Sequence, residues 1–454
     1  MTEPYSPPGA ASAPDDDSQA ARQSPATAPT SNLEPRQCAS PWPPHGGQGE
    51  ALLQCLGVDP SSATGPLVDL SASLNPLGPP TWFADWLAGA GGHLWRYPDP
   101  RQPLARAALA AHHGVAQQQL WLTNGGAEAI HLVAQCHRGG RALIVEPTFG
   151  EYARACALND ISVSRIMLQG DEFRLDVDAL CQAMTGVDLV FLCRPNNPTG
   201  TLARRDDVAT LLLHARRVGA VLVVDEAFAE FSDEGEDEGE DEGEDESADF
   251  ECSDDAAGDR RCAAQGPLCQ WLVPGADTSV DVPLVLLRSL TKFYTLPGLR
   301  LGYVMASAAR IQALAERQVA WSLNGLAEAV VPELLADGDF AEASRGWVDG
   351  ERDRLCQALR ALGLVVSESR ANFVLLRLPG AATPQRGEVL LRGLARHAIL
   401  GRHTHTFRGL DGAWVRLALS TAEVNDRVIE ALADIIAAET AAGGSQTPRS
   451  GGSA

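Results

Sequence analysis

Lys292 is the only lysine among the 454 residues of this chain, although arginine is common throughout it. Arginine can replace lysine in solvation, ion pairs and phosphate contacts, but it keeps its proton at every usable pH. A lysine amine loses its proton once burial or neighbouring charge lowers its pKa, and it can then attack a carbonyl group. An arginine-biased lineage could also keep one lysine by chance, so the neighbouring motifs must decide.

Polar motifs accompany Lys292, and each of them follows a run of apolar residues. Residues 194–200 read RPNNPTG, 224–228 read VDEAF, and 289–292 read SLTK with GLRLG at 298–302. The turn residues of RPNNPTG are ordinary on their own. An aspartate at the end of an apolar strand is costly to bury without a cationic partner.

A glycine-rich motif, TNGGAE at 123–128, opens a predicted helix. The free N–H groups at the start of a helix can hold a phosphate. Together the motifs require one ligand that carries an aldehyde, a pyridinium nitrogen, a phenolic oxygen and a phosphate. That ligand is pyridoxal 5′-phosphate (PLP).

Strands and helices alternate along the part of the chain that carries these motifs. Near-continuous apolar runs at 141–147, 187–193, 220–228 and 283–290 predict strands buried on both faces, and 206–219 has helical periodicity. This alternation predicts an α/β fold with a mostly parallel sheet flanked by helices. Ligands of such sheets bind at the carboxyl ends of the strands, where the motifs lie.

A smaller α+β domain is predicted towards the C-terminus. After about residue 308 the pattern changes to a long helix, then to strands at 371–378 and 413–420, then to a helix near 422–438. We therefore expect an N-terminal arm and a large PLP-binding domain over 45–307, and a small domain over 308–440.

Three further segments have the composition of disordered chain. Residues 1–44 are rich in Pro, Ala, Ser and Gln, and residues 441–454 form a flexible tail. A low-complexity insertion at about 232–265 carries 16 acidic residues and no basic one over 233–259, which accounts for most of the net charge of −23. We interpret it as a solvated loop; the alternative is a docking or metal-binding strip.

The composition argues against several classes of protein. The chain has no apolar run near 18 residues, no signal peptide and no lipidation motif, so we expect a cytoplasmic protein without a membrane partner. Its clustered charge has the wrong sign for nucleic acid. The ten cysteines are scattered, without a CxxC pair or zinc-like spacing, so we expect reduced thiols and no metal site.

NNPTG, DEAF and SLTK, in that order and each after a predicted strand, resemble the motifs of the aminotransferase-like PLP enzymes of fold type I over roughly residues 45–440. The resemblance implies that Lys292 carries the cofactor covalently. It implies that Asp225 pairs with the pyridinium nitrogen, so that the ring accepts electrons, and that Asn197 hydrogen-bonds the phenolic oxygen.

The same resemblance implies the remaining cofactor contacts. Phe149 and Ala227 would pack against opposite faces of the ring. The groups expected to bind the cofactor phosphate are Ser289, Arg300 and the backbone of Gly125, Gly126 and Ala127. Tyr97, in RYPDP, resembles the tyrosine that reaches the phosphate of a neighbouring subunit, which implies a homodimer with shared active sites. The alternatives are a turn residue for Tyr97 and a structural ion pair for Arg300.

Other motifs narrow the resemblance to a family. HGG at 45–47, DLSASLNPLG at 69–78 and the residues around Lys292 resemble those of the threonine-phosphate decarboxylases of cobalamin biosynthesis, which make (R)-1-amino-2-propanol phosphate from L-threonine O-3-phosphate. The alternative family is that of the histidinol-phosphate aminotransferases, which typically has tyrosine at the Phe228 position and lacks HGG. Without that tyrosine, Asn197 is left to stabilise the phenolic oxygen.

Both substrates are phosphorylated, so the resemblance implies a second phosphate-binding set. The residues expected to bind substrate are His45, Gly46, Ser73, Asn197, Asn372, Arg402 and Arg416. Arg416, in WVRLAL, matches the arginine that holds the substrate carboxylate. The family usually has asparagine at the Ser73 position, so that contact is expected to be weakened or rerouted. Outside the HGG context, His45 would be read as a surface residue.

The reaction type depends on which bond of the substrate Cα stands perpendicular to the cofactor ring, and the sequence does not encode that angle. The choice of decarboxylation over transamination therefore depends on the resemblance. A non-catalytic PLP-fold regulator is a further alternative, but residues 1–44 contain no helix-turn-helix pattern of the kind such regulators normally carry.

Overall fold

The computed structural model describes residues 41–59, 65–232, 267–272 and 281–444. The described residues from Trp42 onwards form one compact unit, which contains all the described helices and strands. The predicted tails at 1–44 and 441–454 lie outside the described residues up to residue 40 and from residue 445, and the acidic insertion does so from residue 233. Residues 441–444, expected in the C-terminal tail, belong to the final helix.

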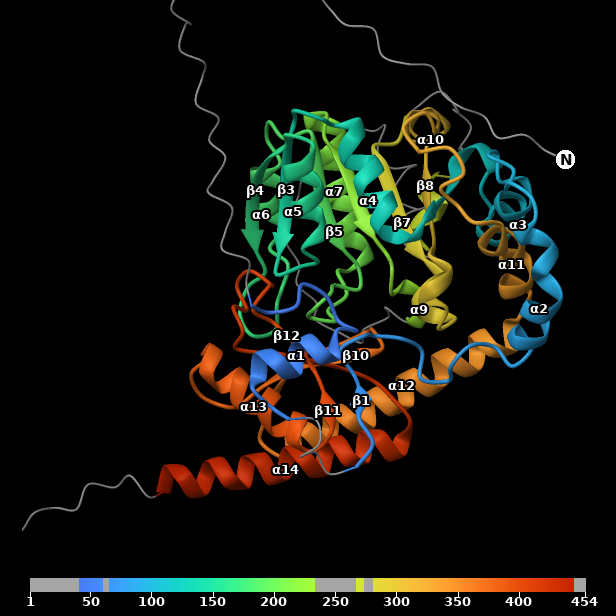
Figure 1. Ribbon diagram of the computed structural model, residues 1–454. Coiled ribbons are helices and arrows are strands. Elements are labelled where there is room, and N and C mark those ends of the chain that lie inside the picture. The colour runs from blue at the N-terminus through green and yellow to red at the C-terminus, as the bar shows by residue number, and fades with distance from the viewer. Residues whose placement is uncertain (1–40, 60–64, 233–266, 273–280, 445–454) are drawn as a thin grey trace, which may run out of the picture. The chain divides into compact units, whose positions relative to one another are not determined.

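A seven-stranded sheet forms the centre of the large domain (Figure 1). Its strands lie in the order β2-β8-β7-β6-β5-β3-β4. They are β2 (Leu120–Asn124), β3 (Arg141–Glu146), β4 (Ser162–Met167), β5 (Leu189–Cys193), β6 (Val221–Asp225), β7 (Leu284–Ser289) and β8 (Leu301–Ala306). Strand β8 is antiparallel to β2 and β7, and the other pairs are parallel. The four strands predicted from apolar runs are confirmed as β3, β5, β6 and β7.

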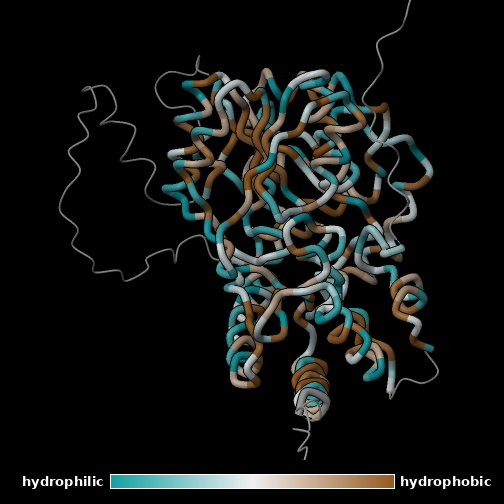
Figure 2. The backbone as a smooth tube through the Cα atoms, turned by 90° about the vertical axis from the view of Figure 1, so that its left-hand side faces the viewer, coloured by the Kyte–Doolittle hydropathy of each residue, from teal (hydrophilic) through white to brown (hydrophobic). Residues whose placement is uncertain are grey.

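Successive side chains of the central strands enter two different hydrophobic cores, because a strand alternates its side chains between the faces of a sheet. On β5, Phe191 joins the core beneath α4 and α5, whereas Leu192 joins the core beneath α6 and α7. Figure 2 shows hydrophobic residues running along the middle strands. The helices around this sheet are α3 (Pro103–His113), α4 (Gly125–Cys136), α5 (Glu151–Leu158), α6 (Val177–Ala183), α7 (Arg205–Val218), α9 (Leu290–Phe293) and α10 (Ala308–Ala315).

A smaller domain lies below this sheet in Figure 1 and is built on an antiparallel sheet of order β12-β13-β10-β9. The strands are β9 (Val365–Val366), β10 (Phe373–Arg377), β12 (Arg402–His403) and β13 (Val415–Ala418). The helices that follow the large domain are α11 (Gly325–Ala336), α12 (Gly338–Ala361), α13 (Pro384–Arg396) and α14 (Ala422–Gly444). The predicted strands at 371–378 and 413–420 and the final helix are confirmed.

The N-terminal segment is attached to the small domain. Strand β1 (Val68–Asp69) pairs in parallel with β11 (Ile399–Leu400), and helix α1 (Gly49–Leu56) contacts α13. Helix α2 (Phe83–Gly89) then leads the chain towards the large sheet. Short 3₁₀ turns complete the elements at Ala90–Leu94 (η2), Gln117–Gln119 (η3), Ala229–Phe231 (η4), Leu268–Leu272 (η6) and Pro297–Leu299 (η7).

The long helix expected after residue 308 is α12, but it begins only at Gly338, and the shorter helices α10 and α11 precede it. Side-chain caps explain the breaks. Asn324 accepts a hydrogen bond from the N–H of Ala327 at 2.8 Å and starts α11, and Asp337 accepts one from Phe340 at 3.0 Å and starts α12. Such caps favour a new helix start over continuation of the previous one.

The described residues contain neither a membrane-spanning helix nor a metal-binding cluster. None of the helices described is long and apolar enough to cross a membrane. No group of three or more histidine, cysteine or acidic side chains is placed to hold a metal ion in this part of the chain.

Candidate active site

Lys292 lies at the carboxyl edge of the large sheet, on the short helix α9 that directly follows β7. Its amine donates a hydrogen bond to Ser289 Oγ at 3.2 Å and lies 5.4 Å from the ring centroid of Phe228. Desolvation lowers the pKa of the Lys292 amine, and the nearby Asp225 opposes that shift. The site therefore favours the neutral amine more than water does, as a nucleophile or proton carrier requires.

Asp225 ends β6 and is buried, so its carboxylate has lost most of its water. The hydroxyl of Tyr152 donates to Asp225 Oδ2 at 2.7 Å, and the N–H of Ala227 donates to Oδ1 at 3.0 Å. Burial raises the pKa of Asp225 despite these hydrogen bonds and the charge of Lys292. A cationic partner at this carboxylate would relieve the cost of burying it, and a pyridinium nitrogen is such a partner.

The start of α4 forms a cradle with Arg300. Gly125 has a φ of +75°, and a Cβ built there would lie 2.5 Å from Arg300 Nη2, so the guanidinium rests against the glycine backbone. A Cβ at Gly302 would lie 2.7 Å from Gly126 N, so Gly302 allows β8 to approach the same turn. Glycine is required at both places, and the exposed Arg300 faces the N–H groups of a helix start.

Arg416 and Asn197 join the two domains at the site. Arg416 Nη1 donates to Asn197 Oδ1 through a short contact, and Nη2 donates to the carbonyl of Ser71 at 2.8 Å. Burial lowers the pKa of Arg416. Because the oxygen of the Asn197 amide is bonded to Arg416, its NH₂ group is left to act as a donor towards a phenolic oxygen.

Three residues predicted to bind substrate each hold a buried polar atom that has no hydrogen-bond partner among the described residues. These atoms are Ser73 Oγ, Asn372 Oδ1 and Arg416 Nε. Buried polar atoms are normally hydrogen-bonded, so unpaired ones call for an explanation such as a ligand. Asn372 uses its NH₂ group to bind the carbonyl of Leu74 at 2.9 Å.

Phe228 and Phe373 form an apolar wall beside the lysine. Their rings meet edge to face at 5.1 Å, and both side chains are buried. The guanidinium of Arg416 lies 4.9 Å from the Phe373 ring. The wall therefore separates the amine of Lys292 from water on this side. It contains no hydroxyl group that could hydrogen-bond the phenolic oxygen of the cofactor.

The N-terminal arm enters the site through HGG. A Cβ at Gly46 would overlap the carbonyl of Ser71, and the N–H of Gly47 donates to Ser71 Oγ at 2.8 Å. The ring of His45 lies 6.1 Å from that of Phe149. Only glycine fits where the arm crosses Ser71, which explains the HGG sequence.

Arg402 binds the arm in this structure. Its Nη1 donates to the carbonyl of Pro43 at 3.0 Å, and its Nη2 donates to the carbonyl of Pro44 at 2.6 Å and to Thr406 Oγ1 at 2.8 Å. Burial lowers the pKa of Arg402 to about 10. A contact between Arg402 and a substrate phosphate requires exchange of one of these bonds.

Tyr97 lies away from these groups at the surface, where it is 80% exposed. Its ring contacts that of Trp321 at 4.7 Å. Other large apolar or aromatic side chains are exposed on or next to η2, at the start of α3 and in the segment before α11, and α11 contacts both η2 and α3: Leu94, Trp95, Leu104, Val319 and Trp321.

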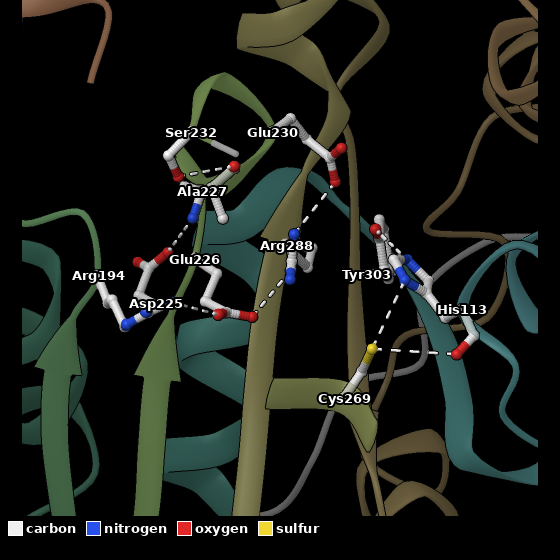
Figure 3. A network of polar contacts seen from close by, with 11 residues as sticks. His113, Arg194, Asp225, Glu226, Ala227, Glu230, Ser232, Cys269, Arg288 and Tyr303 are labelled. Atoms are coloured by element: carbon white, nitrogen blue, oxygen red, sulfur yellow. Dashed lines mark hydrogen bonds and ion pairs between the residues drawn. The ribbon is translucent and has the colours of Figure 1, made fainter. Parts of the chain in front are cut away.

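Ion pairs connect residues at or after the ends of β5, β6 and β7, and Figure 3 shows this network of polar contacts. Glu226 lies 2.9 Å from Arg288 Nε and 3.7 Å from Arg194 Nη1, and Arg288 Nη1 lies 3.2 Å from Glu230. These charges follow or end β5, β6 and β7, next to Asp225 and the residues that precede Lys292. Removing one partner of such a set is strongly destabilising, because it leaves a buried charge unpaired.

Sequence reasoning missed several of these residues. Tyr152 and Glu151 follow Phe149 within EPTFGEY, while Glu226 and Arg288 are direct neighbours of Asp225 and Ser289. The signal that could have found them was a charged or polar residue inside an otherwise apolar motif. Ser71 gave no such signal, because its role is to support Arg416 from a distant part of the chain.

The comparisons with known proteins agree with this geometry. Residues 66–432 match the model of the family "Aminotransferase class I and II". The chain belongs to this family, whose cofactor is PLP. Asp225, the glycine cradle and the unpaired polar atoms of this structure fit that cofactor together with a substrate.

Within the family, the chain is a homologue of the threonine-phosphate decarboxylases. It is 33% identical to the threonine-phosphate decarboxylase of Salmonella typhimurium, covering 86% of this chain and 96% of that one. The L-threonine-O-3-phosphate decarboxylase of Porphyromonas gingivalis matches with a TM-score of 0.60 and 26% identity, over 78% of this chain and 94% of that one. The histidinol-phosphate aminotransferase of Clostridium acetobutylicum matches with a TM-score of 0.69 and 25% identity, over 82% and 100%.

Proposed function

We propose that this protein is a PLP-dependent decarboxylase that converts L-threonine O-3-phosphate to (R)-1-amino-2-propanol phosphate and carbon dioxide in cobalamin biosynthesis. The observation that carries the proposal is the 33% identity to the Salmonella enzyme over 96% of that enzyme's length. Phe228 and the HGG arm support it, since both separate the decarboxylase motifs from those of the aminotransferases. The alternative is histidinol-phosphate transamination, which the structural match favours by TM-score alone.

The residues of this chain have distinct roles in such a reaction. Bound PLP supplies an electron sink for the bond that breaks at the substrate Cα. Arg416 holds the substrate carboxylate and His45 contacts its phosphate, and two anchors at opposite ends of a small substrate fix the orientation of Cα. Lys292 takes a proton from the ammonium group of the substrate and delivers it to Cα in place of the carboxylate that leaves as carbon dioxide. Phe228 and Phe373 keep water away from the lysine amine.

The first prediction separates decarboxylation from transamination. Given L-threonine O-3-phosphate and no keto acid, the PLP-loaded protein should release carbon dioxide and aminopropanol phosphate over many turnovers, which headspace carbon dioxide and product chromatography measure. A transaminase stops after one half-reaction, because its cofactor is left in the amine form. Histidinol phosphate with 2-oxoglutarate is the control, and rapid glutamate formation there without carbon dioxide release would support the aminotransferase instead.

We propose the domain division expected from the sequence, with the large domain and its arm up to residue 307, the small domain over 308–440 and the acidic insertion at about 232–265. The described residues on either side of the insertion are anchored in the large domain. Phe231 packs against the Phe293 ring at 5.0 Å, and Leu268 is buried.

Deletion of residues 233–260, closed by a short Gly/Ser linker, should therefore leave turnover within about 2-fold of the full chain. Surface loops of different length differ little in closure free energy, roughly 0.6 kcal/mol per doubling. Steady-state carbon dioxide release measures the effect, and a well-folded deletion variant that has lost turnover would assign the acidic run a role in the reaction.

We also propose a cytoplasmic homodimer in which Tyr97 reaches the cofactor phosphate of the partner subunit. The exposed patch around Tyr97 supports an interface, because monomers seldom expose several large apolar side chains together. Five cysteines of the described residues are free thiols, as is usual in a reducing compartment: Cys136, Cys156, Cys181, Cys193 and Cys356.

Trp95→Asp tests the interface, since Trp95 is 82% exposed within this patch. We expect sedimentation velocity to change from dimer to monomer and turnover to fall with it, because a charge placed in an apolar interface loses its water without gaining a partner. Leu213→Asp, at an exposed leucine on α7, is the matched control and should stay dimeric. An active monomer of Trp95→Asp would contradict the shared site.

A further inference from the structure

Glu151 is a buried carboxylate with no role of its own in the proposed reaction. It begins α5, and its side chain is 9% exposed. Its oxygens contact side chains from three segments: Oε1 lies 3.2 Å from His45 Nε2 and 3.4 Å from Arg154 Nη1, and Oε2 lies 3.5 Å from His131 Nε2. A hydrogen bond from His45 is the main reason that the pKa of Glu151 is lowered to about 2. The carboxylate is therefore ionised at neutral pH.

The place of Glu151 in the chain links it to the cofactor pocket. Two residues earlier, Phe149 presents the ring that is expected to stack on the cofactor. One residue later, Tyr152 donates its hydroxyl to Asp225. The segment 149–152 therefore contains the ring expected to stack on the cofactor and the hydroxyl that binds Asp225, and through Glu151 it also contacts the N-terminal arm.

His45 needs such a partner. Its side chain is 43% exposed, and its backbone N–H makes only a long contact, 3.4 Å, with Gln48 Oε1. Gly46 and Gly47 fix the backbone of the arm on Ser71, but a backbone contact does not fix the rotamer of a neighbouring imidazole. Restraining that ring needs a contact to the ring itself, and Glu151 supplies a charged one.

We propose that Glu151 is the positioning residue for His45. Its carboxylate accepts a hydrogen bond from Nε2, so that the imidazole stays beside Phe149 with its Nδ1–H group free to donate to the phosphate of the substrate. His131 contacts the other oxygen, Oε2, at 3.5 Å and keeps the carboxylate from rotating away. This inference rests on the proposed function only for the identity of the phosphorylated substrate.

The test uses the PLP-loaded full chain with Glu151→Gln, which keeps the shape and removes the charge. KM for L-threonine O-3-phosphate should rise about 10-fold, equivalent to about 1.4 kcal/mol, with kcat within about 2-fold. The inhibition constant of inorganic phosphate should rise by a similar factor. Arg154→Gln, which removes an exposed partner of the same carboxylate, is the matched control and should leave both constants unchanged.

A double-mutant cycle separates positioning from general weakening of the fold. If Glu151 acts through His45, Glu151→Gln should have no further effect in a His45→Ala background, because contacting residues that act as a unit are not additive. Additive effects would overturn the proposal. So would a fall in KM for Glu151→Gln, since that result would mean that the carboxylate mainly repels the substrate phosphate. Glu151→Asp, which keeps the charge on a shorter side chain, carries the test with a smaller shift if Glu151→Gln does not fold.

Hydrogen exchange of the arm supplies a readout that does not depend on turnover. Peptides covering residues 42–52 should exchange faster in Glu151→Gln than in the parent chain, while the Arg154→Gln peptides match the parent. If the protein does not decarboxylate threonine phosphate, the proposed function fails, but exchange and a calorimetric titration with inorganic phosphate still report on Glu151. Unchanged exchange together with unchanged phosphate affinity would overturn its role.

Discussion

Lys292→Ala abolishes turnover and leaves the protein unable to hold its cofactor covalently. We expect the rate to fall by about 10⁴-fold or more, because proton transfer by a positioned side chain alone contributes about 10²–10⁴-fold and the covalent attachment is lost as well. Lys292→Arg should be no better, since a guanidinium keeps its proton. Steady-state release of carbon dioxide measures the loss.

The single lysine makes a chemical assignment possible as well. Borohydride should fix the cofactor on the parent protein, and peptide mapping should find one adduct, on Lys292, because the chain contains no other lysine. Ser289→Ala is the control: it removes only the hydroxyl that lies 3.2 Å from the amine, so the adduct should remain. A reducible adduct on Lys292→Ala would remove the basis of the proposed chemistry.

The sequence predicted the parts of the site that short motifs carry. Strands β5, β6 and β7 are continuous apolar runs, and each leads directly into the polar residues that follow it, so the order of motifs in the chain reproduces their order at the sheet edge. Asp225 and Lys292 could therefore be placed together from the sequence alone, because parallel strands present their carboxyl ends at one edge.

Contacts between distant segments could not be read in the same way. Arg416 meets Ser71 and Asn197 across the two domains, and Arg402 meets the arm at Pro43 and Pro44. The residue type shows which groups an arginine can bind, but it does not show which carbonyl the side chain reaches in the folded protein. For that reason Arg402 was expected at the substrate phosphate, whereas its guanidinium bonds the arm in the structure.

The partners of buried charged residues could not be predicted from the sequence, for a different reason. Glu226 and Arg288 lie inside apolar motifs, and a buried charge has no place in a core unless another charge faces it. The sequence contained both members of this pair, 62 positions apart, but only the pairing of β6 with β7 shows that they meet. The same holds for Tyr152, because only the fold shows that its hydroxyl donates to Asp225 Oδ2 at 2.7 Å.

Asp225→Asn tests the charge at the end of β6 and should lower turnover by roughly 10²–10³-fold. The substitution keeps the shape of the side chain and its hydrogen bond with Tyr152, but it removes the charge expected to face the pyridinium nitrogen. Breaking a buried ion pair from one side costs about 3–5 kcal/mol, and each 1.36 kcal/mol of barrier is a factor of ten in rate. Carbon dioxide release and the absorption spectrum of the bound cofactor measure the effect.

Tyr152→Phe provides the graded comparison, because it leaves the charge of Asp225 and removes one hydrogen bond to it. A hydrogen bond to a charged group contributes about 1.5–3 kcal/mol, so turnover should fall by about 10-fold and by no more than about 100-fold. The buried Asp225 carboxylate also loses a donor that lowers its pKa, so the kcat/KM profile should shift its acid limb to higher pH. If Tyr152→Phe is as damaging as Asp225→Asn, or Asp225→Asn keeps the parent spectrum and rate, then the charge of Asp225 does not act on the cofactor ring.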